Sequence, residues 1–416
     1  MEENNAPKKE PYMTFDPPQT PTQETPVKGL RFDFNAGLRV SVPESKFRVR
    51  FIDRDAALTV YDSPASGVMA TSTKRYFVNF RLEVYEMPDE EEQKKRKDKD
   101  EPLLEEKLVF SHDYDANGKK VMMKFAGAAM GDLLAWFPYA EAFRVKHGCE
   151  VYAWMDKQYI EILRAGYPDI HFLAPDDERP DDLYATYYVG LFAPWDDRNL
   201  QPTDWRVVGL QAHAAYLLGV EPKETPPRLL PSPGAKKIRP KEPYVCIATQ
   251  ATAQCKYWNN AQGWMDTVAY LKELGYRVLC VDRERVTVNG IYGNSIPYGA
   301  EDFTGDRSLQ ERVDLISGAD FFIGLSSGLS WLAWGAGVPV VMIVGFTAPG
   351  TEFHTPYRVQ QFHTCHSCAN DQRYEHKYDD FGSCPHHRGT DQEFECTRCI
   401  TSEYVRDMID RVRAGS

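Results

Sequence analysis

The sequence contains no uninterrupted apolar run near the roughly 20 residues that a helix needs to cross a bilayer. The N-terminal stretch from Met1 to Val27 is polar and proline-rich, and it has none of the apolar core of a secretory signal. We therefore expect a soluble, cytoplasmic protein that does not insert into a membrane.

Basic charge is also in short supply. Lysine and arginine number 49 against 61 aspartates and glutamates, so the formal net charge is −12. A nucleic-acid-binding protein needs a basic face that neutralises phosphates, so the composition argues against a nucleic-acid partner. A local basic patch around a phosphorylated small molecule remains allowed. The 416 residues, 42% of them hydrophobic, are enough for two or three domains with cores of their own.

Cysteine is scarce over most of the chain and crowded at one end. Five of the nine cysteines share a C-terminal segment, namely Cys365, Cys368, Cys384, Cys396 and Cys399. In a cytoplasmic chain this pattern indicates a metal site before disulfides, and two Cys-X-X-Cys pairs build a tetrahedral thiolate site for zinc or iron. Such a site leaves no open position for a substrate, so we expect a structural role. One cysteine is spare, and the possible substitutes are His363, His366, His386 and His387.

The N-terminal quarter of the chain has the pattern of β structure. Residues 1–28 are predicted to form a disordered tail, and 29–115 a small β-rich domain with a hairpin turn at Asn35-Ala36-Gly37. The charge run from Pro88 to Glu101 is predicted to be a solvated loop.

A strand–turn–helix alternation begins at residue 119. It predicts an α/β domain with a parallel sheet over 119–232, a proline-rich linker over 222–243 and a second α/β domain over 244–360. A cleft between two such halves is the usual place for a ligand. The cysteine-rich segment then covers 361–402, and a helix is expected over 403–416.

The most informative stretch runs from Phe321 to Trp331. An apolar strand ends in Ser326-Ser327-Gly328-Leu329 and a helix follows, so free N–H groups and the helix dipole form an anion site suited to phosphate. Gly328 allows a ligand to approach the backbone closely. The alternative is an ordinary strand–helix–strand unit with nothing bound.

Three charged residues stand at comparable turns. Asp132 follows Gly131 at a strand-to-helix turn and would face the cleft, or would simply be favoured by the helix dipole. Lys256 lies in the polar loop from Thr249 to Trp258 and would pair with a diphosphate, or be a surface lysine. Asp282 follows a strand and would accept from a ribose hydroxyl, or be a turn residue.

Together these motifs resemble a known enzyme superfamily. The Gly131-Asp132-Leu133-Leu134 turn with Pro138, the loop from Thr249 to Trp258 and the Ser326-to-Leu329 turn are similar to the heptosyltransferase motifs, in the same order and spacing. The cysteine segment narrows the resemblance to the bacterial autotransporter heptosyltransferases, relatives of the enzymes of lipopolysaccharide core assembly. The resemblance covers roughly residues 119–402. It implies a GT-B glycosyltransferase fold with two Rossmann-like domains, a β-rich N-terminal domain and a cysteine metal finger.

The resemblance also implies an activity, which is transfer of heptose from ADP-heptose to serine side chains of an autotransporter passenger domain, with inversion. By position Asp132 matches the catalytic base, Lys256 the diphosphate-binding lysine and Ser327-Gly328 the phosphate loop. The substrate-binding set is Thr249, Gln250, Lys256, Trp258, Asp282, Ser326, Ser327, Gly328 and Leu329. The core-assembly branch usually carries an aspartate, which holds donor-sugar hydroxyls, where this chain has Ser326. The sugar contacts therefore stay open.

For the finger, the family pattern implies structural iron on Cys365, Cys368, Cys384 and Cys396, with Cys399 spare. The alternative ligand set is rubredoxin-like and uses Cys399 instead of Cys384. The alternative metal is zinc instead of iron. The family also implies a homo-oligomer, a ring of twelve subunits, that the β-rich domain helps to assemble.

Three other functions remain possible at this point. The chain could be a core-assembly heptosyltransferase that acts on a glycolipid, or a GT-B enzyme that uses a UDP- or GDP-linked hexose. A non-enzymatic metal-ribbon adaptor would explain the cysteines, but it would not explain the acidic charge or the cleft-facing Asp132 and Lys256.

Overall fold

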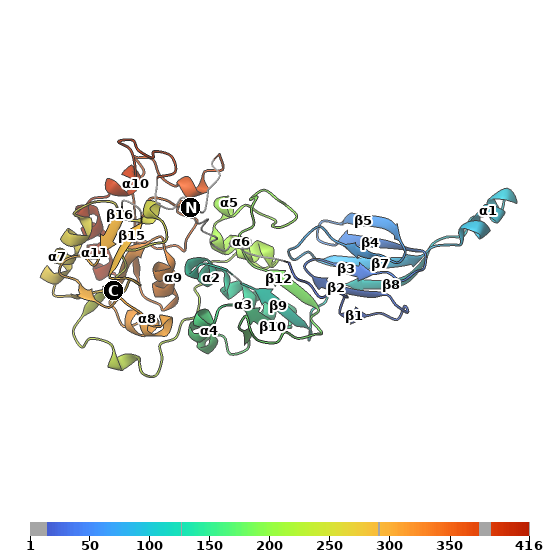
Figure 1. The fold of residues 1–416 in the computed structure, drawn as a ribbon, viewed down its shortest axis with the longest axis horizontal. Helices are drawn as coiled ribbons and strands as arrows, with labels where there is room; N and C mark the ends of the chain where they lie inside the picture. The colour runs from blue at the N-terminus through green and yellow to red at the C-terminus, as the bar shows by residue number, and fades with distance from the viewer. Residues whose placement is uncertain (1–14, 126, 290–291, 374–383, 416) are drawn as a thin grey trace, which may run out of the picture.

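The structure is a computed structural model that describes residues 15–125, 127–289, 292–373 and 384–415 (Figure 1). The molecule is elongated. A sheet of four strands projects from one end, a central α/β half follows, and a second α/β half carries the cysteine segment at the other end. No helix in the described ranges has the length and apolar content needed to cross a membrane.

The projecting sheet is antiparallel, with the order β5-β4-β7-β8. Its strands are β4 (Phe47–Asp53), β5 (Leu58–Ala65), β7 (Phe80–Glu86) and β8 (Lys107–Asp113). Buried and partly exposed residues alternate along β4 and β7, as one-sided burial requires. The charge run expected to be a loop contains helix α1 (Glu90–Asp98), which Asp89 caps. It buries no residue, so its solvent exposure agrees with the sequence even though its conformation does not.

The remaining N-terminal strands belong to a different sheet. β2 (Arg31–Asn35) and β3 (Arg39–Ser41) form the predicted hairpin, and β6 (Met69–Thr71) pairs with β3. However, β2 also lies parallel to β12 (Ala185–Tyr188), so these strands extend the sheet of the first α/β half. The prediction of a separate β domain over 29–115 is therefore wrong for β2, β3 and β6.

The predicted disordered tail is also wrong for residues 15–28. β1 (Gln23–Glu24) pairs antiparallel with β2. The Asp16 carboxylate accepts hydrogen bonds from Lys124 Nζ and Arg179 Nη1, each at 2.6 Å. These contacts fix a polar, proline-rich segment that has no core of its own. Residues 1–14 lie outside the described ranges.

The first α/β half is built on parallel strands in the order β11-β10-β9-β12. The other strands are β9 (Lys120–Lys124), β10 (Glu150–Trp154) and β11 (His171–Leu173). Its helices are α2 (Met130–Trp136), α3 (Pro138–His147), α4 (Lys157–Leu163), α5 (Trp205–Val208) and α6 (Leu210–Leu217). The alternation predicted from residue 119 onward is confirmed.

The second half has a parallel sheet in the order β17-β14-β13-β18-β19-β20. The strands are β13 (Tyr244–Ile247), β14 (Arg277–Cys280), β17 (Glu301–Asp302), β18 (Phe322–Leu325), β19 (Val340–Val344) and β20 (Arg358–Gln360). The helices are α7 (Gly263–Glu273), α8 (Leu309–Ile316), α9 (Gly328–Gly335), α10 (Glu395–Arg398) and α11 (Ser402–Ala414). A hairpin of β15 (Val286–Asn289) and β16 (Tyr292–Ser295) stands apart from the sheet. Two Rossmann-like halves confirm the predicted fold class.

The two halves touch at small residues. An ideal Cβ on Gly131 in α2 would lie 3.4 Å from Gly328 Cα in α9, so the two helix starts come together. Gly209 has a φ of +81°, and a Cβ there would meet Gly350 O at 1.9 Å. Leu210 N donates to Thr351 O at 3.2 Å beside this contact. Close packing of backbone on backbone therefore fixes how the halves face each other.

Candidate active site

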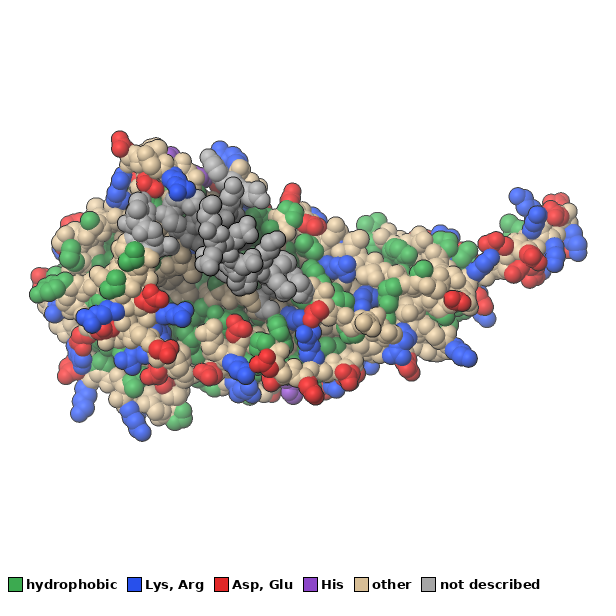
Figure 2. All heavy atoms as spheres, in the orientation of Figure 1, with side chains coloured by type: hydrophobic (Ala, Val, Ile, Leu, Met, Phe, Trp, Pro, Cys, Tyr) green, Lys and Arg blue, Asp and Glu red, His purple; other side chains and the backbone are tan. Residues whose placement is uncertain are grey.

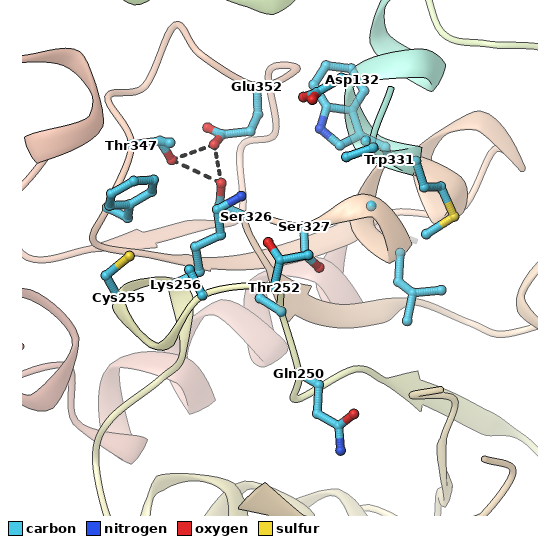
Figure 3. A pocket seen from close by; sticks show the side chains of 18 of the residues that line it. Asp132, Gln250, Thr252, Cys255, Lys256, Ser326, Ser327, Trp331, Thr347 and Glu352 are labelled. Atoms are coloured by element: carbon cyan, nitrogen blue, oxygen red, sulfur yellow. Dashed lines mark hydrogen bonds between the residues drawn. The ribbon is translucent and has the colours of Figure 1, made fainter. Parts of the chain in front are cut away.

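A cavity of about 550 Å³ lies between the two halves. The first half contributes Asp132, Leu191 and Trp205 to its wall, and the second half contributes the donor loop (Thr249–Asn260) and the turn after β18. Figure 3 shows Asp132 on one side of this cavity and Lys256, Ser327 and Glu352 on the other. The carboxyl ends of both parallel sheets thus meet at one site, where α/β folds bind ligands.

Asp132 is the third residue of α2 and is partly buried. Burial raises the pKa of its carboxyl to about 6, and Lys256 offsets part of this rise by favouring the charged form. A residue placed only to complement the helix dipole would not have a raised pKa. A carboxylate that faces a cavity and titrates near neutral pH fits a general base.

The turn after β18 is arranged as the sequence predicted. Ser327 is the N-cap of α9, and its Oγ is buried with no hydrogen-bond partner in the described residues. Gly328 leaves little room for a side chain, because a Cβ there would lie 3.0 Å from Met130 Cβ and 3.1 Å from Gly131 N. Free N–H groups of a helix start and an unpaired hydroxyl make this turn a site for an anion.

The donor loop is fixed at its start by Asp282. This carboxylate is 1% exposed and accepts from Thr249 N at 2.9 Å, Thr249 Oγ1 at 2.8 Å and Gln250 N at 3.1 Å. Both oxygens are therefore engaged within the loop. The structure shows that Asp282 organises the start of the loop, and Asp282 also lines the cavity, so its contact with a ribose hydroxyl stays a prediction. Gln250 lines the cavity as expected.

Lys256 and Trp258 lie near the end of the donor loop, and their side chains point to different places. Lys256 lines the cavity, as predicted. The indole of Trp258 is instead buried outside it, where Nε1 donates to Ile400 O at 3.0 Å and the ring packs on Trp264. Trp258 does not line this cavity, and its predicted contact with the substrate stays a prediction. Its large apolar surface is used to brace the loop on the chain that follows the cysteines.

Sequence reasoning missed an acidic residue in the cavity wall. Glu352 lies in the loop after β19, and its carboxylate accepts from the hydroxyls of Ser326 and Thr347 and from Arg358 Nη1 at 3.1 Å. Figure 3 shows Ser326, Thr347 and Glu352 joined in a triangle beside Lys256. The loop has no glycine-rich or strand-end motif, so no signal in the sequence marks Glu352.

Four cysteine thiols converge behind the donor loop. Cys368, Cys384 and Cys396 are buried and Cys365 is partly buried. Burial raises the pKa of Cys396 to about 12, and the nearby Cys384 and Cys365 raise it as well. Cys365 Sγ also lies 3.7 Å from His386 Nδ1. Cys399 is exposed.

These thiols are of the chemical type that binds a metal as thiolates. Cys368 interacts electrostatically with the other three predicted ligands and also with the buried Cys255, while Cys399 faces solvent. Within the described ranges no group of three or more Cys, His, Asp or Glu side chains is yet close enough to enclose an ion. Cys365, Cys368, Cys384 and Cys396 would be the thiolate ligands of such a metal.

Two family models match the chain. Residues 26–88 match the N-terminal domain of glycosyltransferase TibC, and residues 196–381 match glycosyltransferase family 9 (heptosyltransferase). The first match covers β2, β3 and β6 and three of the four strands of the projecting sheet, β4, β5 and β7. The second covers the donor loop, the phosphate turn and Glu352.

Two curated relatives extend over almost the full length. The autotransporter heptosyltransferase BAHTCr of Citrobacter rodentium is 46% identical over 402 residues, covering 96% of this chain and 93% of the relative. The inactive autotransporter heptosyltransferase BimC of Burkholderia thailandensis is 36% identical over 395 residues, covering 95% and 88%. Membership of the family is thus compatible with loss of activity, so activity has to be argued from the site.

A solved structure has the same fold throughout. The iron-containing dodecameric glycosyltransferase TibC from enterotoxigenic Escherichia coli H10407 is 43% identical, covers 96% of this chain and 99% of its own, and superposes with a TM-score of 0.86. TibC has also been solved in complex with ADP-D-β-D-heptose, with the same identity and TM-score. On this similarity of sequence and fold, the chain belongs to the autotransporter heptosyltransferase family.

Proposed function

We propose that this chain is an active protein O-heptosyltransferase that moves heptose from ADP-heptose to serine hydroxyls of an autotransporter passenger. The observation that carries the proposal is the cavity itself, in which Asp132 from one half interacts electrostatically with Lys256 from the other. A base and a cation on opposite walls suit a reaction in which a proton leaves the acceptor while negative charge builds on the leaving group.

The donor would bind to the second half. Its diphosphate would take the N–H groups at the start of α9, the unpaired Ser327 hydroxyl and the Lys256 ammonium. Preorganised donors of this kind stabilise a developing negative charge by about 3–4 kcal/mol each. Fixed positive groups thus supply the charge stabilisation on this wall.

The acceptor serine would approach from the first half. Asp132 accepts the proton of the serine hydroxyl while its oxygen attacks the anomeric carbon on the face opposite ADP. The bond from that carbon to the β-phosphate oxygen breaks, and its electron pair leaves with ADP. The configuration inverts, and general-base assistance of this kind contributes roughly 10²- to 10⁴-fold in rate.

We further propose that Cys365, Cys368, Cys384 and Cys396 hold a structural iron, as TibC is iron-containing, with zinc as the alternative ion. TibC is dodecameric, which supports an assembly of twelve subunits here. We also propose a cytoplasmic location, because a reducing compartment keeps cysteines available as metal ligands.

Co-expression with an autotransporter passenger, in cells that make ADP-heptose, tests the proposal. The intact mass of the passenger should rise in steps of one heptose, and Asp132→Ala should abolish the steps while ADP still binds. Asp156→Ala is a matched control, since Asp156 is an exposed carboxylate at the start of α4 outside the cavity. Steps of hexose size would change the donor, and an unmodified passenger would contradict the proposed acceptor.

A further inference from the structure

A buried carboxylate beside the phosphate turn has no part in the proton or phosphate chemistry described above. Glu352 is 7% exposed and lies in the loop between β19 and β20, where it lines the cavity together with Ser326 and Thr347. An ionised side chain so far from solvent requires partners that offset its lost hydration.

One carboxylate oxygen of Glu352 is held by a fixed charge. Arg358 Nη1 donates to Oε2 at 3.1 Å, and Arg358 is itself oriented by Gln360 Oε1, which accepts from its Nε at 2.8 Å. The guanidinium keeps the carboxylate in place. If Glu352 were only a structural partner of Arg358, its second oxygen would need no further arrangement.

The second oxygen carries hydroxyl donors. Both Ser326 and Thr347 place a hydroxyl at hydrogen-bond distance from Oε1, and the two hydroxyl oxygens lie 3.0 Å apart (Figure 3). Two neighbouring hydroxyls on one carboxylate oxygen resemble the way in which a sugar diol is bound. An ionised carboxylate can only accept, whereas a serine or threonine hydroxyl can rotate to face another oxygen.

The location agrees with the path of a donor sugar. Ser326 directly precedes the N-cap of the phosphate helix, and Lys256 lines the same wall. A sugar on the terminal phosphate would leave that turn and extend toward Asp132, and on the way its ring would pass the wall formed by Glu352.

We propose that Glu352, positioned by Arg358, accepts hydrogen bonds from hydroxyls of the donor sugar and so determines which sugar nucleotide is used. The inference rests on the proposed function, because it assumes a sugar nucleotide in this cavity. When the sugar binds, Ser326 and Thr347 turn their hydroxyls from Glu352 to sugar oxygens, and the carboxylate receives the sugar hydroxyls instead.

The test compares two ligands on one variant. In Glu352→Gln the affinity for ADP-heptose, measured by calorimetry without acceptor, should fall about 10- to 100-fold, the range for a hydrogen bond to a charged group. The affinity for ADP, which has no sugar, should stay within twofold. Glu224→Gln is the matched control: Glu224 accepts from His354 N at 2.7 Å and holds the same loop, but it does not line the cavity. It should leave both affinities within twofold.

The outcomes separate the inference from the proposed function. Equal binding of ADP-heptose by the wild type and Glu352→Gln, or an equal loss of both ligands, would overturn the role of Glu352. If the wild type instead had the same affinity for UDP-glucose as for ADP-heptose, the proposed donor itself would be wrong. Should Glu352→Gln not fold, Thr347→Val removes one hydroxyl and keeps the Arg358 pair. The affinity of this variant for ADP-heptose must fall at least threefold while its affinity for ADP is unchanged. An unchanged affinity for ADP-heptose would overturn the inference.

Discussion

At the scale of single residues, two of the acidic side chains that line the cavity, Asp132 and Glu352, have contrasting surroundings. Asp132 has no hydrogen-bond donor from the described chain and its pKa is raised by burial, whereas Glu352 is held by Arg358 and two hydroxyls. A loosely held, weakly acidic carboxylate can take up a proton. A tightly held one can only receive hydrogen bonds, and so the two can serve different steps.

The first prediction concerns pH. Because burial raises the pKa of Asp132 to about 6, its protonated and inactive form accumulates as the pH falls below that value. The kcat/KM for passenger heptosylation should therefore reach a plateau above about pH 7, be half-maximal near pH 6 and fall about tenfold per pH unit below. Rates between pH 4.5 and 8 check this.

The Lys256→Ala variant tests the origin of this pH dependence. Lys256 favours the charged form of Asp132, so Lys256→Ala should move the midpoint to higher pH as well as weaken ADP binding. A rate that does not change between pH 5 and 8 in the wild type would remove Asp132 from the role of base.

At the scale of elements, the cysteine segment and the donor loop are one structural unit. Asn259 Nδ2 donates to Thr397 Oγ1 at 2.9 Å, and Asn260 Nδ2 donates to Ile400 O at 3.1 Å. Ala253 and Cys255 pack in one apolar cluster with Cys384 and Phe394. The cysteine segment therefore supports, from behind, the loop that presents Lys256.

This coupling predicts the effect of a substitution remote from the ligand. Thr397→Val keeps the shape of a fully buried residue but removes the acceptor for Asn259. Loss of about 1 kcal/mol of loop support should weaken ADP binding roughly three- to tenfold. Thr390→Val is the control, because Thr390 is exposed and bonds only within its own turn. Equal ADP affinity in both variants would show that the cysteine segment does not support the donor loop.

A second prediction at this scale decides between the two possible ligand sets. Cys384 is buried among the other thiols and Cys399 is exposed, so Cys384→Ser should lose most of the bound metal and Cys399→Ser should keep it. Metal content per chain, measured by mass spectrometry of the purified protein, gives the answer. The reverse result would favour the rubredoxin-like set.

The sequence predicts the helices and strands of the two halves well, but it does not predict which distant segments pair or meet. The run from Glu150 to Trp154 is a strand as predicted, and the turn after β18 does face the cavity. Local periodicity carries that information. It carries none about β2 pairing with β12, since a parallel pair between distant segments leaves no local pattern. Glu352 was missed for a similar reason, because its site arises only where its loop meets Ser326.

At the scale of the whole molecule, activity depends on how the halves are held together. Gly209→Ala would place a methyl group 1.9 Å from Gly350 O and force a positive φ on alanine. The halves should separate locally, so transfer should fall at least tenfold. ADP binding, which needs only the second half, should stay within about threefold. Activity equal to the wild type would show that this contact does not set the alignment.

The pairing of β2 with β12 also bears on the order in which the chain folds. β2 and its hairpin leave the ribosome early, but their parallel neighbour follows about 150 residues later in the sequence. β1 already pairs with Arg31 and Phe32, but until β12 is made the Phe34–Asn35 end of β2 keeps unpaired N–H and C=O groups to which another chain can add. Such non-local pairing slows folding and prolongs exposure to aggregation. The N-terminal region therefore cannot be detached as an independent folding unit, and a nascent chain that stops before Tyr188 should depend on chaperones.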